Sequence, residues 1–320
     1  MQAPRSSVVV LATGGTIAGI ADTPGDDRGY RSAVLGVEAL LAALPPGVAL
    51  PPLESEQIAQ LDSKDMDFAT WRRLALRIAH HAARAEVAGI VVTHGSDTLE
   101  ETAYFLARVV PLAKPVVLTA AMRPASSRAA DGPRNLADAI AVAHRVGRGG
   151  VVAVLAGEVH AGRTLRKVHS RDLAAFGSGA DGPLARIDGA TLVPLRPWPA
   201  DDALGLAVLP DEPARWPAVE IVVSGAGAEG RGVRAMVEAG IEGLIVATTG
   251  NGTVHEALAA ELRRAAERGI AVLRSSRCAE GGIVEAAPAG SALPSAGALT
   301  PVQARVELLL RLLAARRPQA

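Results

Sequence analysis

Two threonines and two glycines stand together near the N-terminus, directly after an apolar run. The segment VVVLATGGTIAG (residues 8–19) contains Thr13, Gly14, Gly15 and Thr16. The glycines allow a tight turn and bring backbone N–H groups to face a bound carbonyl, where an oxyanion needs donors. Thr16 would then present its hydroxyl as a nucleophile, provided that another group accepts its proton. The alternative is that both threonines only satisfy backbone groups in a turn.

Several other functions do not fit this sequence. The turn lacks the G-x-G-x-x-G spacing and the later acidic residue of a dinucleotide site, and it lacks the lysine of a P-loop. The formal net charge is zero and no basic stretch is interleaved with aromatic residues, which argues against a nucleic-acid partner. The single cysteine, Cys278, excludes an internal disulfide and a cysteine-based metal site, and we expect a buried thiol without a role.

A second polar cluster lies in THGSDT (residues 93–98), again after an aliphatic run. Asp97 beside the hydroxyl of Ser96 can bind an ammonium group or orient a lysine. The segment is not a G-x-S-x-G nucleophile elbow, because Thr98 stands two residues after Ser96. Ser96 or Asp97 could also simply cap the following helix, which is compatible with catalysis. We expect His94 to be structural and not a base.

Lysine is rare in this chain. Of 33 basic residues only three are lysines, namely Lys64, Lys114 and Lys167. A lysine that remains in an arginine-rich sequence is a candidate for chemistry that arginine cannot supply, since arginine stays protonated. The alternative for each of the three lysines is that it was retained on the surface by chance.

Short aliphatic runs alternate with helical periodicity over the first half of the chain. This rhythm predicts a parallel sheet covered on both faces. The carboxyl ends of parallel strands meet at one edge, which would bring Thr16, Ser96, Asp97 and the backbone around Ala121 into one cleft. The predicted strands are 8–12, 89–93, 115–119 and 151–156, and the predicted helices are 34–44, 66–85, 98–110 and 135–148.

The rhythm stops in a proline-rich stretch and then resumes. We predict a larger N-terminal α/β domain (1–193), a linker (194–216) and a smaller C-terminal α/β domain (217–320). No apolar run is long enough for a membrane span and the N-terminus does not resemble a signal peptide, so we predict a cytoplasmic protein. In the second domain the predicted strands are 219–224, 243–248 and 270–274, and the predicted helices are 232–239, 254–268 and 301–315.

Five motifs in one order across residues 8–312 resemble the bacterial-type L-asparaginases, including the glutaminase-asparaginases. They are LATGGTIAG, THGSDTLEETAYFL, AAMRPASSRAADGPRNL, GNGT and RSSR. The resemblance implies a two-domain asparaginase fold that works as a homotetramer, a dimer of dimers with each active site built between two subunits. It also implies hydrolysis of the side-chain amide of asparagine, and to varying degrees glutamine, through a covalent acyl-enzyme. No metal or organic cofactor is implied.

Site residues follow from the resemblance position by position. Thr16 corresponds to the nucleophile, and Tyr30 in GYRSAVLGVEAL corresponds to the mobile-loop tyrosine that activates it. The second hydroxyl, the acid and the lysine correspond to Ser96, Asp97 and Lys167, the last within GRTLRKVHSRDLAAF. The segment 21–31, rich in Gly, Pro and Asp, is expected to be a mobile lid.

The resemblance also assigns residues that bind the substrate. Asp97 should hold the α-ammonium group, Ser63 in LDSKDM the α-carboxylate, and the Ala121 backbone the leaving amide. The remaining implied substrate-binding residues are Gly15, Asp62 and, from the partner subunit, Asn251 and Glu285.

Two positions depart from the family pattern. Ser96 stands where most relatives have threonine, which keeps the hydroxyl but loses the methyl group that restricts χ1. Lys64 stands where many relatives have Gln or Glu, beside the serine that binds carboxylate. The close alternative to an asparaginase is an enzyme that accepts both amides. A more distant one is the ammonia-donating subunit of a tRNA-dependent amidotransferase, and a third is a non-catalytic amino-acid binder.

Overall fold

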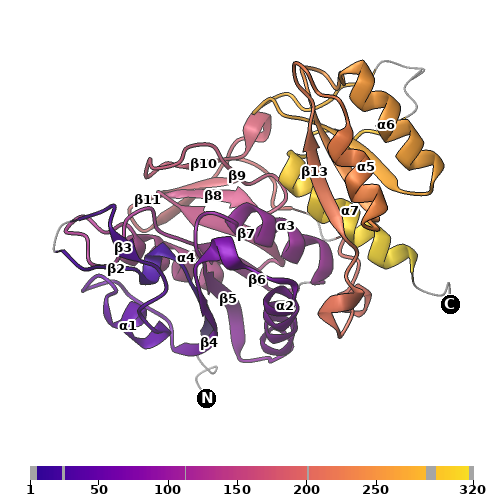
Figure 1. Ribbon diagram of the computed structural model, residues 1–320. Coiled ribbons are helices and arrows are strands. Elements are labelled where there is room, and N and C mark those ends of the chain that lie inside the picture. Colours follow the sequence, from indigo (N-terminus) through magenta and orange to yellow (C-terminus); the bar gives the residue numbers. More distant parts are fainter. Residues whose placement is uncertain (1–5, 24–25, 112, 200–201, 286–292, 317–320) are drawn as a thin grey trace. The chain divides into compact units, whose positions relative to one another are not determined.

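The chain forms two compact units, Met1–Leu206 and Ala207–Ala320. A computed structural model describes residues 6–23, 26–111, 113–199, 202–285 and 293–316. Both units are α/β, as predicted, and each contains its own parallel strands (Figure 1). The boundary between them lies inside the segment predicted to be a linker, and the domain limits at 193 and 217 stay a prediction.

The first unit is built on an eight-stranded sheet. The strand order is β12-β11-β8-β7-β6-β5-β1-β4. The five strands from β7 to β4 are parallel to their neighbours, and β8, β11 and β12 extend the sheet in antiparallel fashion. The strands are β1 (Ser7–Gly14), β4 (Leu53–Leu61), β5 (Val87–Thr93), β6 (Pro115–Thr119), β7 (Gly150–Leu155), β8 (Glu158–Ala161), β11 (Ala185–Asp188) and β12 (Thr191–Pro194).

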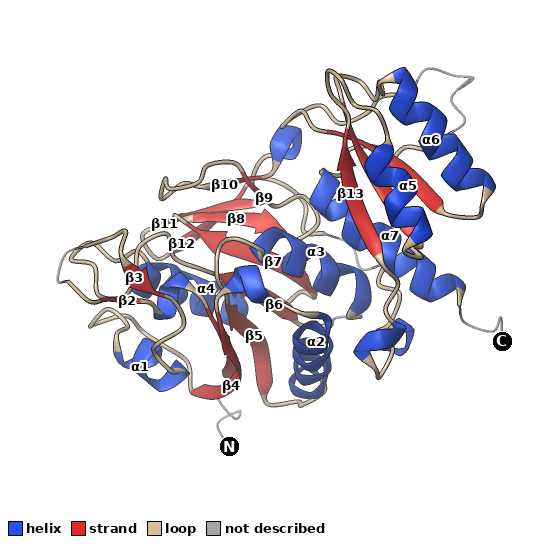
Figure 2. Cartoon of the chain, viewed as in Figure 1, coloured by secondary structure: helices blue, strands red, loops and turns tan. Residues whose placement is uncertain are grey.

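Helices cover both faces of the parallel strands (Figure 2). Strand β1 is buried along its whole length, so its sequence does not alternate between apolar and polar residues. Its Val8, Val10 and Ala12 belong to one aliphatic cluster with Leu136 and Ile140 of α4. On α2 and α3, Trp71 and Phe105 stack with ring centroids 4.6 Å apart. The helices are α1 (Val37–Ala42), α2 (Phe68–Ala82), α3 (Leu99–Val109) and α4 (Gly132–Arg145).

The order of the parallel strands creates a crevice. From β1 the chain goes first to β4 on one side and then, through α2, to β5 on the other side of β1. Connections that leave two neighbouring strands in opposite directions open a gap beyond the carboxyl ends of those strands, which is where α/β sheets bind ligands. The residues that follow β1 and β5 therefore line the expected binding position.

Some features differ from the sequence expectations. Strands β4, β8, β11 and β12 were not among the predicted strands, and β12 lies at the start of the proline-rich stretch. Cys278 is exposed, so the expectation of a buried thiol is wrong. No helix within the described ranges is long and apolar enough to cross a membrane.

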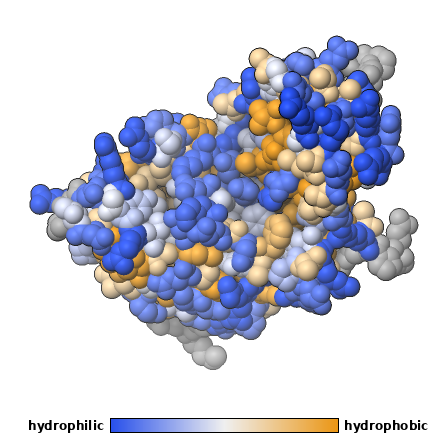
Figure 3. Space-filling model, in the orientation of Figure 1, coloured by the Kyte–Doolittle hydropathy of each residue, from blue (hydrophilic) through white to orange (hydrophobic). Residues whose placement is uncertain are grey.

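The second unit has a three-stranded parallel sheet in the order β13-β14-β15. Helix α7 begins at a capping box in which Thr300 and Gln303 satisfy each other's backbone N–H groups. The surface over α6 is mostly hydrophilic (Figure 3), consistent with the exposed Arg263, Arg264 and Glu267. The elements are β13 (Val219–Val223), β14 (Gly243–Thr248), β15 (Ala271–Ser276), α5 (Arg231–Glu238), α6 (Glu256–Glu267) and α7 (Pro301–Ala315).

Candidate active site

The ends of β1 and β5 meet backbone to backbone. A Cβ atom on Gly15 would lie 2.3 Å from Gly95 Cα, and Gly15 has a φ of +84°. Only glycine tolerates both conditions. Gly15 directly precedes Thr16 and Gly95 directly precedes Ser96, so this contact brings the two predicted hydroxyl groups to the same edge of the sheet.

The backbone of Gly15 is itself engaged. Its N–H donates to the carbonyl of Leu61 at 3.0 Å, and its carbonyl accepts from the N–H of Ala33 at 3.1 Å. The Gly15 amide is therefore not available as the oxyanion donor that the turn suggested. The glycine instead permits the close approach of the two strand ends.

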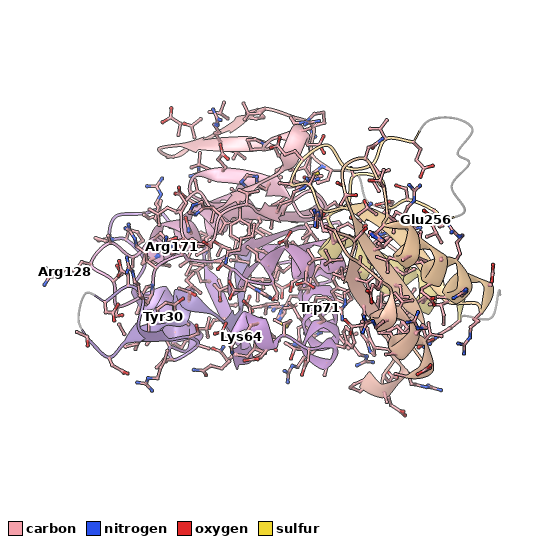
Figure 4. The ribbon with its side chains drawn as sticks, turned by 45° about the horizontal axis from the view of Figure 1, so that its top comes forward. Tyr30, Lys64, Trp71, Arg128, Arg171 and Glu256 are labelled. Atoms are coloured by element: carbon pink, nitrogen blue, oxygen red, sulfur yellow. The ribbon has the colours of Figure 1, made fainter. Side chains whose placement is uncertain are left out.

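Thr16 lies in a short 3-10 helix, Thr16–Ala18, and only 8% of the residue is exposed. Its Oγ1 is 2.8 Å from the hydroxyl of Tyr30, which is labelled in Figure 4. The short antiparallel pair β2 (Ile20–Ala21) and β3 (Tyr30–Arg31) brings the tyrosine back to the threonine. Residues 24–25 of the predicted lid lie outside the described residues, and its mobility stays a prediction.

Lys167 is held by the loop that follows β5. Its Nζ lies 2.9 Å from Ser96 Oγ and 2.6 Å from Asp97 Oδ1. The lysine side chain is 16% exposed, whereas that of Asp97 is 58% exposed and so can contact a ligand as well. The predicted acid, hydroxyl and lysine are therefore assembled, although they are about seventy residues apart in the chain.

Ser63 joins the same loop from the end of β4. Its Oγ accepts from the backbone N–H of Asp97 at 3.2 Å, and its carbonyl accepts from Thr98 Oγ1 at 2.7 Å. The Ser63 hydroxyl can still donate its own proton to an anion. Beside it, Lys64 is exposed and paired with Asp62 at 3.7 Å and Asp65 at 2.5 Å, so its charge is partly neutralised.

The Ala121 backbone is fixed by two side chains of the following motif, ADGPRNL. The Asp131 carboxylate accepts from the N–H groups of Met122 and Arg123, both at 2.9 Å. Asn135 donates to the carbonyl of Ala120 at 3.0 Å. Sequence reasoning quoted this motif but gave neither residue a task. Asp131 stands at the N-cap position of α4, but its side chain makes no capping hydrogen bond there.

His94 is structural, as expected. It is fully buried and Nδ1 lies 2.7 Å from the Gly95 carbonyl, so Nδ1 carries the proton. Trp71 Nε1 donates to Thr102 Oγ1 at 2.8 Å, which leaves the Thr102 hydroxyl to donate to His94 Nε2 at 3.0 Å. Burial lowers the pKa of His94 to about 4, so the ring is neutral near pH 7.

Asn251 and Glu285 lie in the second unit, close to each other. The Asn251 amide donates to the carbonyl of Val284 at 2.9 Å and accepts from its N–H at 2.7 Å. The neighbouring Glu285 is paired with Arg274 at 2.7 Å. A local cluster therefore joins the two residues that the sequence assigned to the partner subunit.

The comparisons with known proteins agree with this geometry. Residues 7–198 match the family model "Asparaginase, N-terminal", and residues 218–320 match "Glutaminase/Asparaginase C-terminal domain". The protein belongs to the asparaginase family. This confirms the resemblance drawn from the five sequence motifs and, with it, the two-domain asparaginase fold.

Individual asparaginase relatives cover nearly the whole chain. L-asparaginase 2 of Escherichia coli (strain K12) is 36% identical over 98% of this chain and 90% of its own. Glutaminase-asparaginase of Pseudomonas fluorescens biotype A is 34% identical over 87% of this chain and 77% of its own. A crystal structure of a probable cytoplasmic L-asparaginase from Campylobacter jejuni superposes with a TM-score of 0.89, at 34% identity, over 96% of this chain and 95% of that one.

Proposed function

We propose that this protein hydrolyses L-asparagine to L-aspartate and ammonia through an acyl-enzyme on Thr16. The observation that carries the proposal is the 2.8 Å contact between Thr16 Oγ1 and the Tyr30 hydroxyl, at the end of β1, whose neighbour β5 leads into the Ser96–Asp97–Lys167 cluster. Relatives named L-asparaginase support the substrate class.

In the proposed reaction, Thr16 Oγ1 attacks the side-chain carbonyl of asparagine and passes its proton to the Tyr30 hydroxyl, while that hydroxyl gives its own proton onward to the amide nitrogen. The new Oγ1–C bond forms, the C–N bond breaks, and the amide nitrogen takes a proton and leaves as ammonia. Water then attacks the ester carbon, releases aspartate and returns the proton to Thr16. Lys167, Asp97 and Ser96 assist proton transfer and orientation.

The substrate's charged ends have matching groups. We assign the α-ammonium to Asp97, which is more than half exposed, and the α-carboxylate to the hydroxyl of Ser63 beside Asp62. The backbone at Ala121 faces the leaving amide. We further propose that Gly15 contacts the substrate, and that a partner subunit of a homotetramer contributes Asn251 and Glu285. No metal or cofactor takes part in this proposal.

Replacing Thr16 by alanine tests the nucleophile. We expect Thr16→Ala to lower kcat for ammonia release from L-asparagine by roughly a thousandfold or more, because no second hydroxyl replaces the missing bond-forming atom. Steady-state ammonia release from asparagine and glutamine, each at micromolar and millimolar concentration, is the measurement.

Thr13→Val is the matched control for this change. The Thr13 hydroxyl is buried and bonded to the Thr93 carbonyl at 2.9 Å, so its loss should weaken the fold slightly and leave turnover within a few-fold. Near-normal turnover in a folded Thr16→Ala protein would overturn the assignment.

A mixed specificity is the second candidate. Relatives named glutaminase-asparaginase favour it, since one of them is 34% identical over 87% of this chain. The ratio of kcat/KM for the two amides separates the candidates. A cytoplasmic location stays a prediction, since one relative is named a probable periplasmic L-asparaginase and one solved neighbour a probable cytoplasmic one.

A further inference from the structure

The position of Tyr30 depends on two residues that precede it, Gly19 just before β2 and Ala21 within β2. A Cβ atom on Gly19 would lie 2.9 Å from Tyr30 Cδ2, so the aromatic ring lies directly against this glycine. Gly19 has a φ of −85°, which any residue can adopt, so crowding and not backbone conformation favours glycine here. Ala21 pairs with Tyr30 across the antiparallel pair β2–β3. A shift of Gly19 or Ala21 would therefore move the tyrosine hydroxyl relative to Thr16.

The loop that follows β6 binds the same two residues from outside the β2–β3 pair. The Ala125 N–H donates to the Gly19 carbonyl at 2.9 Å. The Ala21 N–H donates to Ser126 Oγ at 2.8 Å. Strands β2 and β3 have two residues each, and an isolated two-stranded pair is at best marginally stable in water. The contacts with this loop therefore help to fix the pair that carries Tyr30.

The loop that makes these contacts is itself fixed beside the proposed site. At its start the Asp131 carboxylate accepts from the N–H groups of Met122 and Arg123, both at 2.9 Å. Within the loop, the Ser127 N–H donates to the Pro124 carbonyl at 2.9 Å, which closes a turn around Ser126. The loop therefore offers a defined anchor to the neighbouring β2–β3 pair.

A second side chain of the loop also reaches the segment between β2 and β3, but it contributes less. Arg123 Nε lies 3.8 Å from Asp27 Oδ2, and the two side chains are 37% and 42% exposed. An exposed ion pair at this distance stabilises a structure only weakly, because solvent screens both charges. The Ser126 hydroxyl is therefore the side-chain group of the loop that fixes β2 most directly.

We propose that Ser126 is a positioning residue for Tyr30 and acts through the backbone N–H of Ala21. The inference rests on the proposed function, in which the Tyr30 hydroxyl exchanges protons with Thr16. Without the Ser126 hydroxyl, water can satisfy the Ala21 N–H but cannot tether β2 to the loop. The Tyr30 hydroxyl then spends less time at the 2.8 Å distance at which it can take the Thr16 proton.

Ser126→Ala tests the proposal, and Ser126→Thr tests its reversal, because threonine restores the acceptor oxygen. We expect Ser126→Ala to lower kcat for ammonia release by roughly tenfold, since small misplacements of a catalytic group are costly. KM should stay within about twofold, because Ser126 is assigned no substrate contact. Ser126→Thr should return kcat to within about threefold of the wild type. Ser126 is exposed, so we expect the urea midpoint of both variants to match that of the wild type.

Ser127→Ala is the matched control, since it removes the same hydroxyl at the next position. The Ser127 Oγ accepts from the Ala129 N–H at 3.2 Å, a bond that stays within the loop. We expect this variant to keep wild-type kcat. Wild-type kcat in Ser126→Ala overturns the proposal, as does an equal loss in Ser127→Ala or a Ser126→Thr protein as slow as Ser126→Ala.

A measurement without turnover separates this inference from the proposed function. The chain has two tyrosines, Tyr30 and Tyr104, so fluorotyrosine labelling gives two fluorine NMR signals, and Tyr30→Phe assigns them. We expect the Tyr30 signal to shift or broaden in Ser126→Ala and to recover in Ser126→Thr, with the buried Tyr104 signal unchanged. A Tyr30 signal that is the same in Ser126→Ala as in the wild type overturns the link to Ser126. Absence of ammonia release by the wild type overturns the proposed function instead.

Discussion

Lys167 combines a partly buried side chain, 16% exposed, with two polar partners on one loop. Its Nζ lies within hydrogen-bond distance of Ser96 Oγ and Asp97 Oδ1. By contrast, Lys64 is exposed beside two carboxylates, and Lys114 donates to the backbone carbonyl of Arg84. The three lysines thus occupy different surroundings, and only the first is placed for proton transfer at the proposed site.

Lys167→Arg should be almost as damaging as Lys167→Ala. Arginine can keep the ion pair with Asp97, but it stays protonated and cannot take part in proton transfer. We expect kcat to fall by roughly 10²- to 10⁴-fold, the usual contribution of general acid–base catalysis. The measurement is kcat for ammonia release at several pH values. Lys114→Arg should retain wild-type turnover, and full activity in Lys167→Arg would reduce that lysine to a fixed charge.

Residue identity and position after a strand were enough to predict Thr16, Ser96 and Asp97. Tyr30 followed only from the family resemblance, because its approach to Thr16 depends on the pairing of β2 with β3. The role of Asp131 was not predicted. Its carboxylate binds backbone N–H groups of another segment, and no spacing in the sequence reveals which amide a carboxylate will meet.

At the scale of elements, the contact between the ends of β1 and β5 depends on glycine. We expect Gly15→Ala to destabilise the protein by roughly 3 kcal/mol or more and to abolish activity, because strain at positive φ adds to a clash with backbone. Gly47→Ala is the control, since Gly47 has a φ of +80° and nothing within 4 Å of a built Cβ. It should cost only about 1–2 kcal/mol.

Urea unfolding of both variants measures this difference. Equal losses of unfolding free energy for Gly15→Ala and Gly47→Ala would mean that the strand ends can separate to admit a methyl group. The close approach at Gly95 would then not be a condition for the fold.

The parallel strands β1, β5, β6 and β7 were predicted because burial on both faces leaves continuous aliphatic runs. Strand β4 was missed because it lies at the edge of the sheet and its sequence, LESEQIAQL, is mostly polar. Its Glu54 and Glu56 pair with Arg84 and Arg77, so charge pairing occupies positions where a central strand would have valine. Strands β8, β11 and β12 are only four residues long and lack a clear period.

At the scale of the whole molecule, His94 makes stability depend on pH. Its folded pKa is lowered from 6.5 to about 4, so the unfolded chain binds a proton that the folded one does not. The stabilisation is fully present above about pH 6.5 and is lost as the pH falls toward 4. Its size is on the order of 3 kcal/mol.

We therefore expect the destabilisation caused by His94→Gln to be largest at pH 7.5 and to shrink steadily toward pH 4. Urea unfolding of both proteins at four pH values measures it. Glu100 acts in the opposite sense, since its folded pKa is raised and stability is lost as the pH rises from about 4.5 to 7. A destabilisation that does not vary with pH would contradict the role given to His94.

Two units could be predicted because the strand–helix rhythm stops and resumes. The exact boundary between the two units could not be predicted, because side-chain packing determines it. Trp198 lies beyond the predicted end of the first domain, yet its Nε1 donates to the carbonyl of Gly149 and it packs on the core of the first unit. A proline-rich stretch without a period gives no sign of such contacts.

The order of the elements along the chain also determines when the residues of the proposed site have all been synthesised. Thr16 is synthesised near the start, but Lys167 lies about halfway along the chain, on a two-residue strand made after the five parallel strands of the first unit. A ribosome-bound fragment that ends before β9 therefore contains Thr16 and Asp97 but not Lys167. By the mechanism proposed above, such a fragment lacks one of the groups that asparagine hydrolysis needs, so we expect it to release no ammonia.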